Sequence, residues 1–266
     1  MKVKEVVAHL ETLAPRHLAE SWDNVGLLVG DENATVTGVL FTLDVTNEVL
    51  DEAIEKGTNL IISHHPPLFR GIQTIIATHP QQALFMKAIQ NGIHLYAAHT
   101  NIDVADGGMN DWLADALALQ DVTILHVDGT LDNGQSYGIG RVGRLPEAMT
   151  LKELVTLLPE RFYTHGVRYV GQDDKRIETV AILGGAGQSY YTDAVKKGAD
   201  VFITGDTSYH VAQEMADAHL SLIDPGHFIE FIFIEKMRAF YSAFAETNGL
   251  RLHASTHNSD PYQFRK

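Results

Sequence analysis

The stretch AIEKGTNLIIS at residues 53–63 aligns without gaps on AVKKGADVFIT at residues 194–204, and this weak internal repeat bears on the architecture of the chain. Each copy has the pattern of a helix end, a glycine that stops the helix and a short apolar strand. Internal duplication explains the repeat, and so does chance, since this junction is common in α/β proteins. Duplication predicts two similar α/β lobes whose strand ends line one crevice, where open α/β sheets bind ligands.

Helix and strand patterns alternate along the chain. They predict, in order, helix 2–13, strand 34–43, helix 47–56, strand 59–63, helix 79–90, strand 93–98 and helix 107–119. Residues 122–148 are expected to form short strands and turns, with turn residues at Asp128-Gly129 and Asn133-Gly134. We therefore expect an α/β protein of two closely joined lobes, 1–125 and 126–266, with mixed, mainly parallel sheets that face a central crevice.

The composition excludes several kinds of site and partner. The 266 residues include 34 acidic and 20 basic side chains, a formal charge of -14, so we expect no nucleic-acid partner. The chain has no cysteine, so a metal would have to be held by imidazole nitrogen and carboxylate oxygen. No apolar run is long enough to span a membrane and no signal-peptide pattern is present, so we expect a cytoplasmic protein without membrane contact.

Two adjacent histidines, His64 and His65, end the apolar strand 59–63 and precede Pro66 and Pro67, which stop the strand. Imidazole is the commonest protein ligand of transition metals. Because neighbouring strand residues point to opposite faces, the pair could serve two metal ions rather than one. Solvated histidines at a capped strand end are the alternative.

His99 and Asp103 follow the predicted strand 93–98, so their side chains should emerge at the same sheet edge as the histidine pair. A carboxylate at Asp103 could bridge two cations. It could equally cap the following helix or close an Asx-turn.

Further candidates lie in the second copy and after it. His227 and Glu230 are spaced by three after Pro225-Gly226, at the expected start of a long amphipathic helix, so they share one face of its first turn. Helical carboxylate proteins bind metal through such pairs, although a solvated first turn with Glu230 near the positive helix end explains the spacing too. Asp206 and His210 follow the second-copy strand and could be outer partners of metal ligands or turn residues.

Other catalytic patterns fit less well. GGAGQS at residues 184–189 follows a predicted strand, 179–183, and resembles a glycine-rich anion cradle. It lacks the Gly-Lys-Ser/Thr ending of a P-loop, and a tight turn between strand and helix is the alternative. No Gly-x-Ser-x-Gly elbow is present, and Ser63 beside His64 lacks the separate acid of a catalytic triad.

Taken in order, these blocks resemble the signature of the NIF-three-like dinuclear metal-centre proteins, often named GTP cyclohydrolase 1 type 2 homologues. The similar blocks are ESWDNVGL at 20–27, HHPP at 64–67, HTNID at 99–103, TGD at 204–206 with His210, and GHFIE at 226–230. The resemblance covers nearly the whole chain. Some longer relatives carry an inserted middle domain, whereas the second lobe alone fills the positions between Asp103 and His227 here.

The resemblance implies a site and an assembly. The implied ligands of two divalent ions are His64, His65, Asp103, His227 and Glu230. Asp103 and Glu230 would be the bridging carboxylates, and His99 would lie beside the metals as a proton shuttle or orienting group. The family is also expected to form a toroidal homohexamer with its sites facing an internal cavity.

The chemistry of such a site follows from its ligands. Two cations can lower the pKa of a bridging water, and five donors leave open positions for water and substrate. Zn²⁺, Mn²⁺ and Fe²⁺ all accept these ligands, with zinc named first. We expect a metal-dependent hydrolase acting on a small phosphorylated or nucleotide-like molecule, with ring opening of GTP suggested by the resemblance. The alternatives are a non-enzymatic metal-binding adaptor or regulatory protein whose ions stabilise its assembly, and plain structural histidines.

Overall fold

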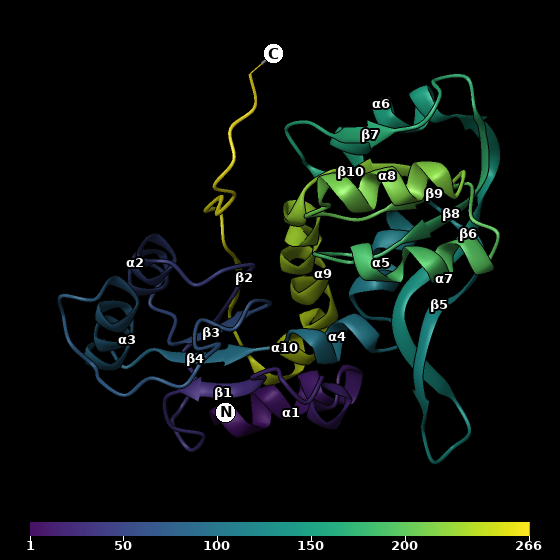
Figure 1. Ribbon diagram of the computed structural model, residues 1–266. Helices are drawn as coiled ribbons and strands as arrows, with labels where there is room; N and C mark the ends of the chain where they lie inside the picture. Colours follow the sequence, from purple (N-terminus) through teal and green to yellow (C-terminus); the bar gives the residue numbers. More distant parts are fainter. Residues whose placement is uncertain (266) are drawn as a thin grey trace. The chain divides into compact units, whose positions relative to one another are not determined.

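The computed structural model describes residues 1–265, which form two compact units (Figure 1). The first unit contains Met1–Ile102 and Phe233–Ser259, and the second contains Asp103–Ile232 and the segment that begins at Asp260. These bounds differ from the single boundary after residue 125 that the sequence indicated. The C-terminal strand β11 (Leu252–Ala254) pairs with β2 (Val39–Thr42) and so returns to the first sheet.

The first unit is built on a five-stranded sheet in the order β1-β4-β3-β2-β11. Its remaining strands are β1 (Gly26–Val29), β3 (Leu60–Ser63) and β4 (His94–Ala97). Strands β11, β2, β3 and β4 run parallel, and β1 joins the β4 edge antiparallel. Parallel neighbours place the C-terminal ends of β3 and β4 at one edge, where the candidate site residues follow.

Helices α2 (Asn47–Glu55) and α3 (Pro80–Gln90) cover one face of this sheet. Their apolar residues, including Leu50 and Phe85, are buried in a cluster with Leu40, Ile61 and Leu95 of the strands. Helix α2 starts at Thr46, whose hydroxyl oxygen accepts from Val49 N at 3.3 Å and thereby satisfies a free donor of the first turn.

The opposite face packs on α1 (Val3–Leu13), α9 (Ile232–Phe240) and α10 (Ser242–Asn248). Phe41 follows Leu40 in β2 and therefore points the other way, toward Tyr241, with 5.3 Å between ring centroids. The Tyr241 hydroxyl donates to Val6 O at 2.9 Å, which ties the C-terminal helices to α1.

The second unit is built on a six-stranded sheet in the order β5-β6-β8-β9-β10-β7. The strands are β5 (Gln120–Thr130), β6 (Ser136–Thr150), β7 (Arg168–Val170), β8 (Arg176–Ile182), β9 (Val201–Ile203) and β10 (Ser221–Asp224). Strands β8, β9 and β10 run parallel, while β5, β6 and β7 pair antiparallel. Both sheets are mixed, as the sequence predicts, with parallel strands at the centre of each.

Helices of the second unit are α5 (Met109–Ala116), α6 (Leu151–Phe162), α7 (Tyr191–Lys196) and α8 (Tyr209–Asp217), and the short α4 (Thr100–Val104) contains the unit boundary. Ala194 of α7 and Met215 of α8 are buried with Phe202 and Leu222 of the sheet. Within residues 1–265, no helix combines the length and apolar character needed to cross a membrane.

Residues 120–150 form one long hairpin instead of the expected short strands. Asn133-Gly134 makes the predicted turn, in which Gly134 N donates to Leu131 O at 2.9 Å. Asp128-Gly129 does not turn, because it lies inside β5, where the register shifts between Val127 and Gly129. A glycine in a strand marks a bulge as readily as a turn, which explains the error.

The repeated stretch has the same local structure in both units. Gly57 and Gly198 have positive φ angles of 62° and 73°, as expected where a left-handed residue ends a helix. After them, Thr58 N donates to Ala53 O at 2.9 Å, and Ala199 N donates to Ala194 O at 3.0 Å. The strands that follow, β3 and β9, have parallel neighbours on both sides. His64-His65 and Gly205-Asp206 therefore leave equivalent strands of their own units.

Candidate metal centre

Three histidines converge in the first unit. His64 and His65 follow β3 and His99 follows β4, and one ring nitrogen of each lies within 4.8 Å of the others. The ring centroids of His64 and His65 are 4.9 Å apart, because β3 ends at Ser63 and strand alternation no longer separates the two side chains. His64 is fully buried, so a solvated histidine does not describe it.

Each of these imidazoles has an oxygen acceptor at Nδ1. The acceptors are Ala98 O for His64 at 2.9 Å, Asp44 Oδ1 for His65 at 2.6 Å and Asp23 Oδ1 for His99 at 2.9 Å. An acceptor at this position favours the tautomer with its proton on Nδ1, and Nε2 then carries the lone pair. This is the arrangement by which proteins orient histidines that ligate metals.

Asp23 is held from two directions. Its Oδ2 accepts from Thr100 N at 3.0 Å and from the Thr100 hydroxyl at 2.6 Å, while Oδ1 contacts His99. Burial alone would raise the pKa of Asp23, but the hydrogen bond and charge of His99 and the hydrogen bonds from Thr100 outweigh it and lower the pKa to about 2. Asp23 is therefore a fixed negative charge behind His99.

Asp44 plays the same part for His65 and comes from the end of a neighbouring strand. Its Oδ2 accepts from the Ser259 hydroxyl at 2.5 Å. Burial would raise the pKa of Asp44, but the hydrogen bond and charge of His65, together with the Ser259 hydroxyl, lower it on balance. The sequence shows no role for Asp44, although its position two residues after β2 places it at the right edge of the sheet.

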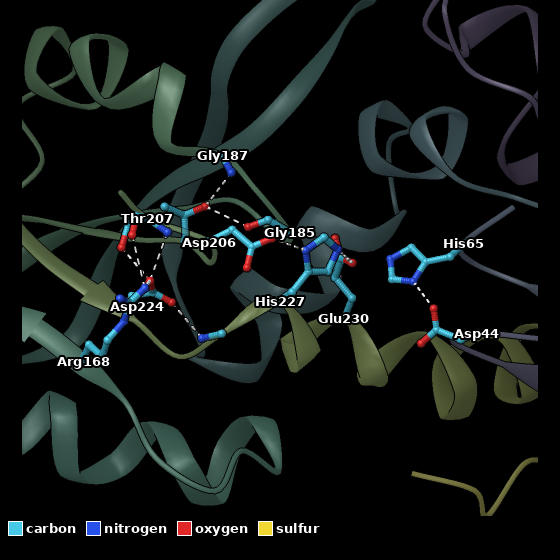
Figure 2. Close-up of polar contacts among 12 residues, drawn as sticks. Asp44, His65, Arg168, Gly185, Gly187, Asp206, Thr207, Asp224, His227 and Glu230 are labelled. Carbon is cyan, nitrogen blue, oxygen red and sulfur yellow. Dashed lines mark hydrogen bonds and ion pairs between the residues drawn. The ribbon is translucent and has the colours of Figure 1, made fainter. Parts of the chain in front are cut away.

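The second unit places His227 between two carboxylates (Figure 2). His227 Nδ1 lies 2.9 Å from Asp206 Oδ2, and Nε2 lies 3.1 Å from Glu230 Oε2. The expected long helix does not begin here: residues His227–Phe231 form a 3₁₀ helix, η3, before α9. Residues three apart eclipse each other in a 3₁₀ helix, so the expected contact of His227 with Glu230 is made by a tighter turn.

The glycine-rich turn lies directly against Glu230. A Cβ atom added at Gly184 would be 3.0 Å from Glu230 Oε1, and one at Gly185 would be 2.8 Å from the same oxygen. Gly185 also has a φ of +59°, which side chains rarely adopt. The turn is fixed by the Thr204 hydroxyl, which accepts from Gly187 N at 2.9 Å (Figure 2). These glycines therefore make room for a carboxylate of the protein itself.

Asn110 connects this turn to Asp103. The buried Asn110 side chain donates to Asp103 O at 2.8 Å and accepts from Gly184 N at 3.1 Å. Both groups of its amide are used, so Asp103 on α4 and the turn beneath Glu230 are held in one arrangement by the second unit alone. Nothing in the sequence pattern singles out Asn110, because its partners are an earlier carbonyl and a distant amide.

Asp224 fixes the loop that carries Asp206. Its Oδ2 accepts from Thr207 N at 3.1 Å and from the Thr207 hydroxyl at 2.5 Å, and it forms an ion pair with Arg168. Its Oδ1 accepts from Gly226 N at 2.9 Å. The segments on either side of the Asp206–His227 contact are thus joined through one buried carboxylate (Figure 2).

His210 has a different environment from the other candidates. It is exposed on α8, and its Nδ1 lies 3.3 Å from Gln213 Oε1 in the same helix. Of the two outer partners suggested by the sequence, the structure places Asp206 against His227 and leaves His210 on the helix surface.

The donors suit a divalent transition metal. The first unit offers oriented imidazoles, and the second offers one imidazole with the carboxylates of Asp103 and Glu230. Nitrogen and oxygen donors of these kinds match Zn²⁺, Mn²⁺ and Fe²⁺. The oxygen acceptor behind each imidazole is a further feature of metal sites that solvated histidines do not need.

Fold and donors define an α/β protein of two mixed-sheet units, each with candidate metal ligands after its parallel strands. The sequence matches the family model Duf34/NIF3 (NGG1p interacting factor 3) over residues 1–261. It is 40% identical over 253 residues to a Streptococcus pneumoniae protein named GTP cyclohydrolase 1 type 2 homolog, with 94% of this chain and 93% of that protein covered. A Clostridium acetobutylicum protein of the same name is 38% identical over 268 residues, and the match covers 100% of this chain and 99% of that protein.

A solved structure gives the same result. The crystal structure of a Bacillus cereus protein related to NIF3 matches with a TM-score of 0.95 at 30% identity, covering 100% of this chain and 99% of that chain. The chain therefore belongs to the DUF34/NIF3 family, which confirms the resemblance seen in its sequence blocks.

Proposed function

We propose that this protein is a dinuclear metal-dependent hydrolase. In this proposal, the ligands of two divalent ions are those that the family resemblance implies, namely His64, His65, Asp103, His227 and Glu230. The observation that carries it is the oxygen acceptor behind the Nδ1 atom of every proposed histidine ligand. These acceptors orient Nε2 as the donor, which solvated histidines would not require.

The ions, when bound, would supply Lewis acidity and make hydroxide available near neutral pH. The protein itself would handle the proton through His99. The carboxylate of Asp23 stays ionised because its pKa is about 2, so it remains a hydrogen-bond acceptor behind His99. Held at Nδ1 by Asp23, His99 can accept a proton at Nε2 and later return it, which is the role of a general base and acid.

The substrate proposed is a small phosphorylated or nucleotide-like molecule. Relatives carry the name GTP cyclohydrolase 1 type 2 homolog, and ring opening of GTP by this chain is a proposal that rests on that name. A homohexameric assembly is likewise a proposal from the family resemblance. Zinc as the first choice of metal is a proposal from the nitrogen and oxygen donors, and a cytoplasmic location is a proposal from the sequence.

A second function is favoured by the distribution of the donors. Within each unit the donors come from segments far apart in the sequence, as His64 and His99 do in the first unit and Asp103 and Glu230 in the second, so bound ions would also tie these segments together. The ions could then serve assembly rather than catalysis, as in a metal-stabilised adaptor protein.

A hydrolysis screen separates the two functions. The protein is loaded with Zn²⁺, Mn²⁺ or Fe²⁺ and assayed on nucleotides, phosphomonoesters, phosphodiesters and pterin precursors, next to Asp103→Ala and His126→Ala. His126 is the matched control, because its Nδ1 also contacts a carboxylate, Asp193, at 3.0 Å on the protein surface.

We expect turnover of at least one substrate class by the wild type and His126→Ala, and none by Asp103→Ala. Activity that survives in Asp103→Ala would reject the proposed site. If no substrate is turned over and a chelator dissociates the assembly, the adaptor function is supported instead.

A further inference from the structure

A cavity of about 270 Å³ opens beside the Asp206–His227 contact of the second unit. Its wall includes Gly166, Arg168, Asp206, Gly226, Tyr262 and Phe264. The volume is close to the lower end of the roughly 300–1,000 Å³ found for small-molecule sites, so it suits a ring system rather than a large ligand.

Two aromatic side chains of the C-terminal segment form the apolar part of the wall. Tyr262 is 69% exposed and Phe264 is 45% exposed, and the Phe264 ring centroid lies 6.4 Å from that of His165. Phe264 is fixed by close packing on the backbone, because a Cβ atom at Gly166 would lie 2.8 Å from Phe264 Cδ1. Exposed rings of this kind are suited to stacking against a flat aromatic ligand.

The charged groups of the cavity argue against an anion. Arg168 is paired with Asp224, which is buried and also accepts from Thr207 and Gly226, so the positive charge of the guanidinium is balanced within the protein. Asp206 uses Oδ2 for His227 and is about half exposed toward solvent. A phosphate in the cavity would therefore meet an exposed carboxylate and an already neutralised cation.

The same groups suit a neutral ring that both donates and accepts hydrogen bonds. Asp206 Oδ1 can accept a hydrogen bond from a ring N–H. Arg168 donates to protein oxygens through Nη2 alone among the described residues, so Nε and Nη1 can donate to a ring nitrogen or carbonyl. Nitrogen heterocycles present both kinds of group in one plane.

We propose that this cavity is a subsite for a neutral, nitrogen-containing heteroaromatic ring stacked on Tyr262 and Phe264. The inference rests on the proposed hydrolase only in making the ring part of its substrate. Because Asp206 would contact both the ring and His227, the ligand would lie next to the proposed centre. Binding of the ring itself requires no metal.

The test uses the full chain freed of metal by a chelator and isothermal titration with adenosine, guanosine, cytidine and free ribose. Tyr262→Ala and Phe264→Ala remove the stacking surface. Tyr209→Ala is the matched control, since Tyr209 is 74% exposed in the same unit and does not line the cavity.

We expect saturable binding of at least one nucleoside and none of ribose. The two cavity variants should weaken it roughly 5- to 100-fold, the range for loss of one stacked ring, and the control should bind like the wild type. The proposal is overturned if no nucleoside binds or if both cavity variants bind like the wild type.

The outcome is independent of the proposed hydrolase. Nucleoside binding to a protein that hydrolyses no substrate would support the proposed subsite and reject the proposed hydrolase. Hydrolysis of a simple phosphomonoester without nucleoside binding would support the proposed hydrolase and reject the proposed subsite.

Discussion

Asp206 Oδ2 lies 2.9 Å from His227 Nδ1, and this contact has counterparts in the other unit. His65 and His99 are held in the same way by Asp44 and Asp23. A carboxylate behind each ring fixes its tautomer and its orientation.

Replacing Asp44 by alanine should weaken metal binding without unfolding the protein. His65 loses the acceptor at Nδ1, and loss of such a partner lowers metal affinity by roughly 10- to 100-fold. The measurement is a competition titration against a chromophoric chelator. Asp193→Ala, which removes the same kind of partner from His126, should leave the affinity unchanged; an equal loss in both variants would show that Asp44 has no special role.

Gly185→Ala should impair metal binding, whereas Gly198→Ala should not. Both residues have positive φ angles, 59° and 73°, so each alanine costs about 1–2 kcal/mol of backbone strain. Only at Gly185 does the new methyl group meet Glu230, at 2.8 Å, while Gly198 faces open space. The same titration, with denaturant unfolding as the stability check, should show lower affinity for Gly185→Ala alone, and equal affinities would refute the role of the glycine turn.

Asn110→Ala should destabilise the metal-free protein by about 2–6 kcal/mol. The substitution leaves Asp103 O and Gly184 N without their buried partner, and each such group costs about 1–3 kcal/mol. Urea unfolding measures the change. Asn91→Ala is the control, because Asn91 is exposed and bonds only within its own helix end; a similar small effect for both would mean that Asn110 does not hold the turn.

His94→Gln should reduce the loss of stability on mild acidification. Burial lowers the pKa of His94, and its Nδ1 accepts from Asp31 N at 3.2 Å, which requires the neutral ring. His94 therefore binds a proton more readily in the unfolded chain than in the folded protein. Its contribution to the free energy of unfolding is complete above its ordinary pKa of 6.5 and is lost as pH falls below that value.

Unfolding of the metal-free protein at pH 7.5 and pH 5.5 checks this. The wild type should lose more stability between the two values than His94→Gln, and a variant of the exposed His17, His17→Gln, should behave like the wild type. Identical pH dependence in all three would contradict the assignment to His94.

Local patterns in the sequence predicted much of the fold. The helix–Gly–strand repeat depends on neighbours in the chain, and both copies form with the same backbone hydrogen bonds. The return of β11 to β2 could not be read in this way, because a strand of three residues has little pattern and its partner is about 200 positions away. The hairpin was misjudged for a related reason, since Gly129 marks a bulge and not a turn.

The candidate site likewise contains some residues that local sequence patterns predict and others that they do not. His64, His65, His227 and Glu230 stand out because they follow strands or share one turn. Their supporting groups come from elsewhere in the chain: Asp44 lies 21 positions from His65, and Asp23 lies 76 positions from His99. The contact between the glycine-rich turn and Glu230 is a tertiary contact. From the sequence alone, the turn could therefore be interpreted only as an anion-binding loop or a tight turn.

Binding of two ions is measured by the metal content of purified protein reconstituted with excess zinc or manganese and freed of unbound ions. We predict two ions per chain for the wild type, and a loss of bound metal in both His65→Ala and Glu230→Ala, one variant in each unit. Negligible metal in the wild type, or equal metal in all three proteins, would contradict the account.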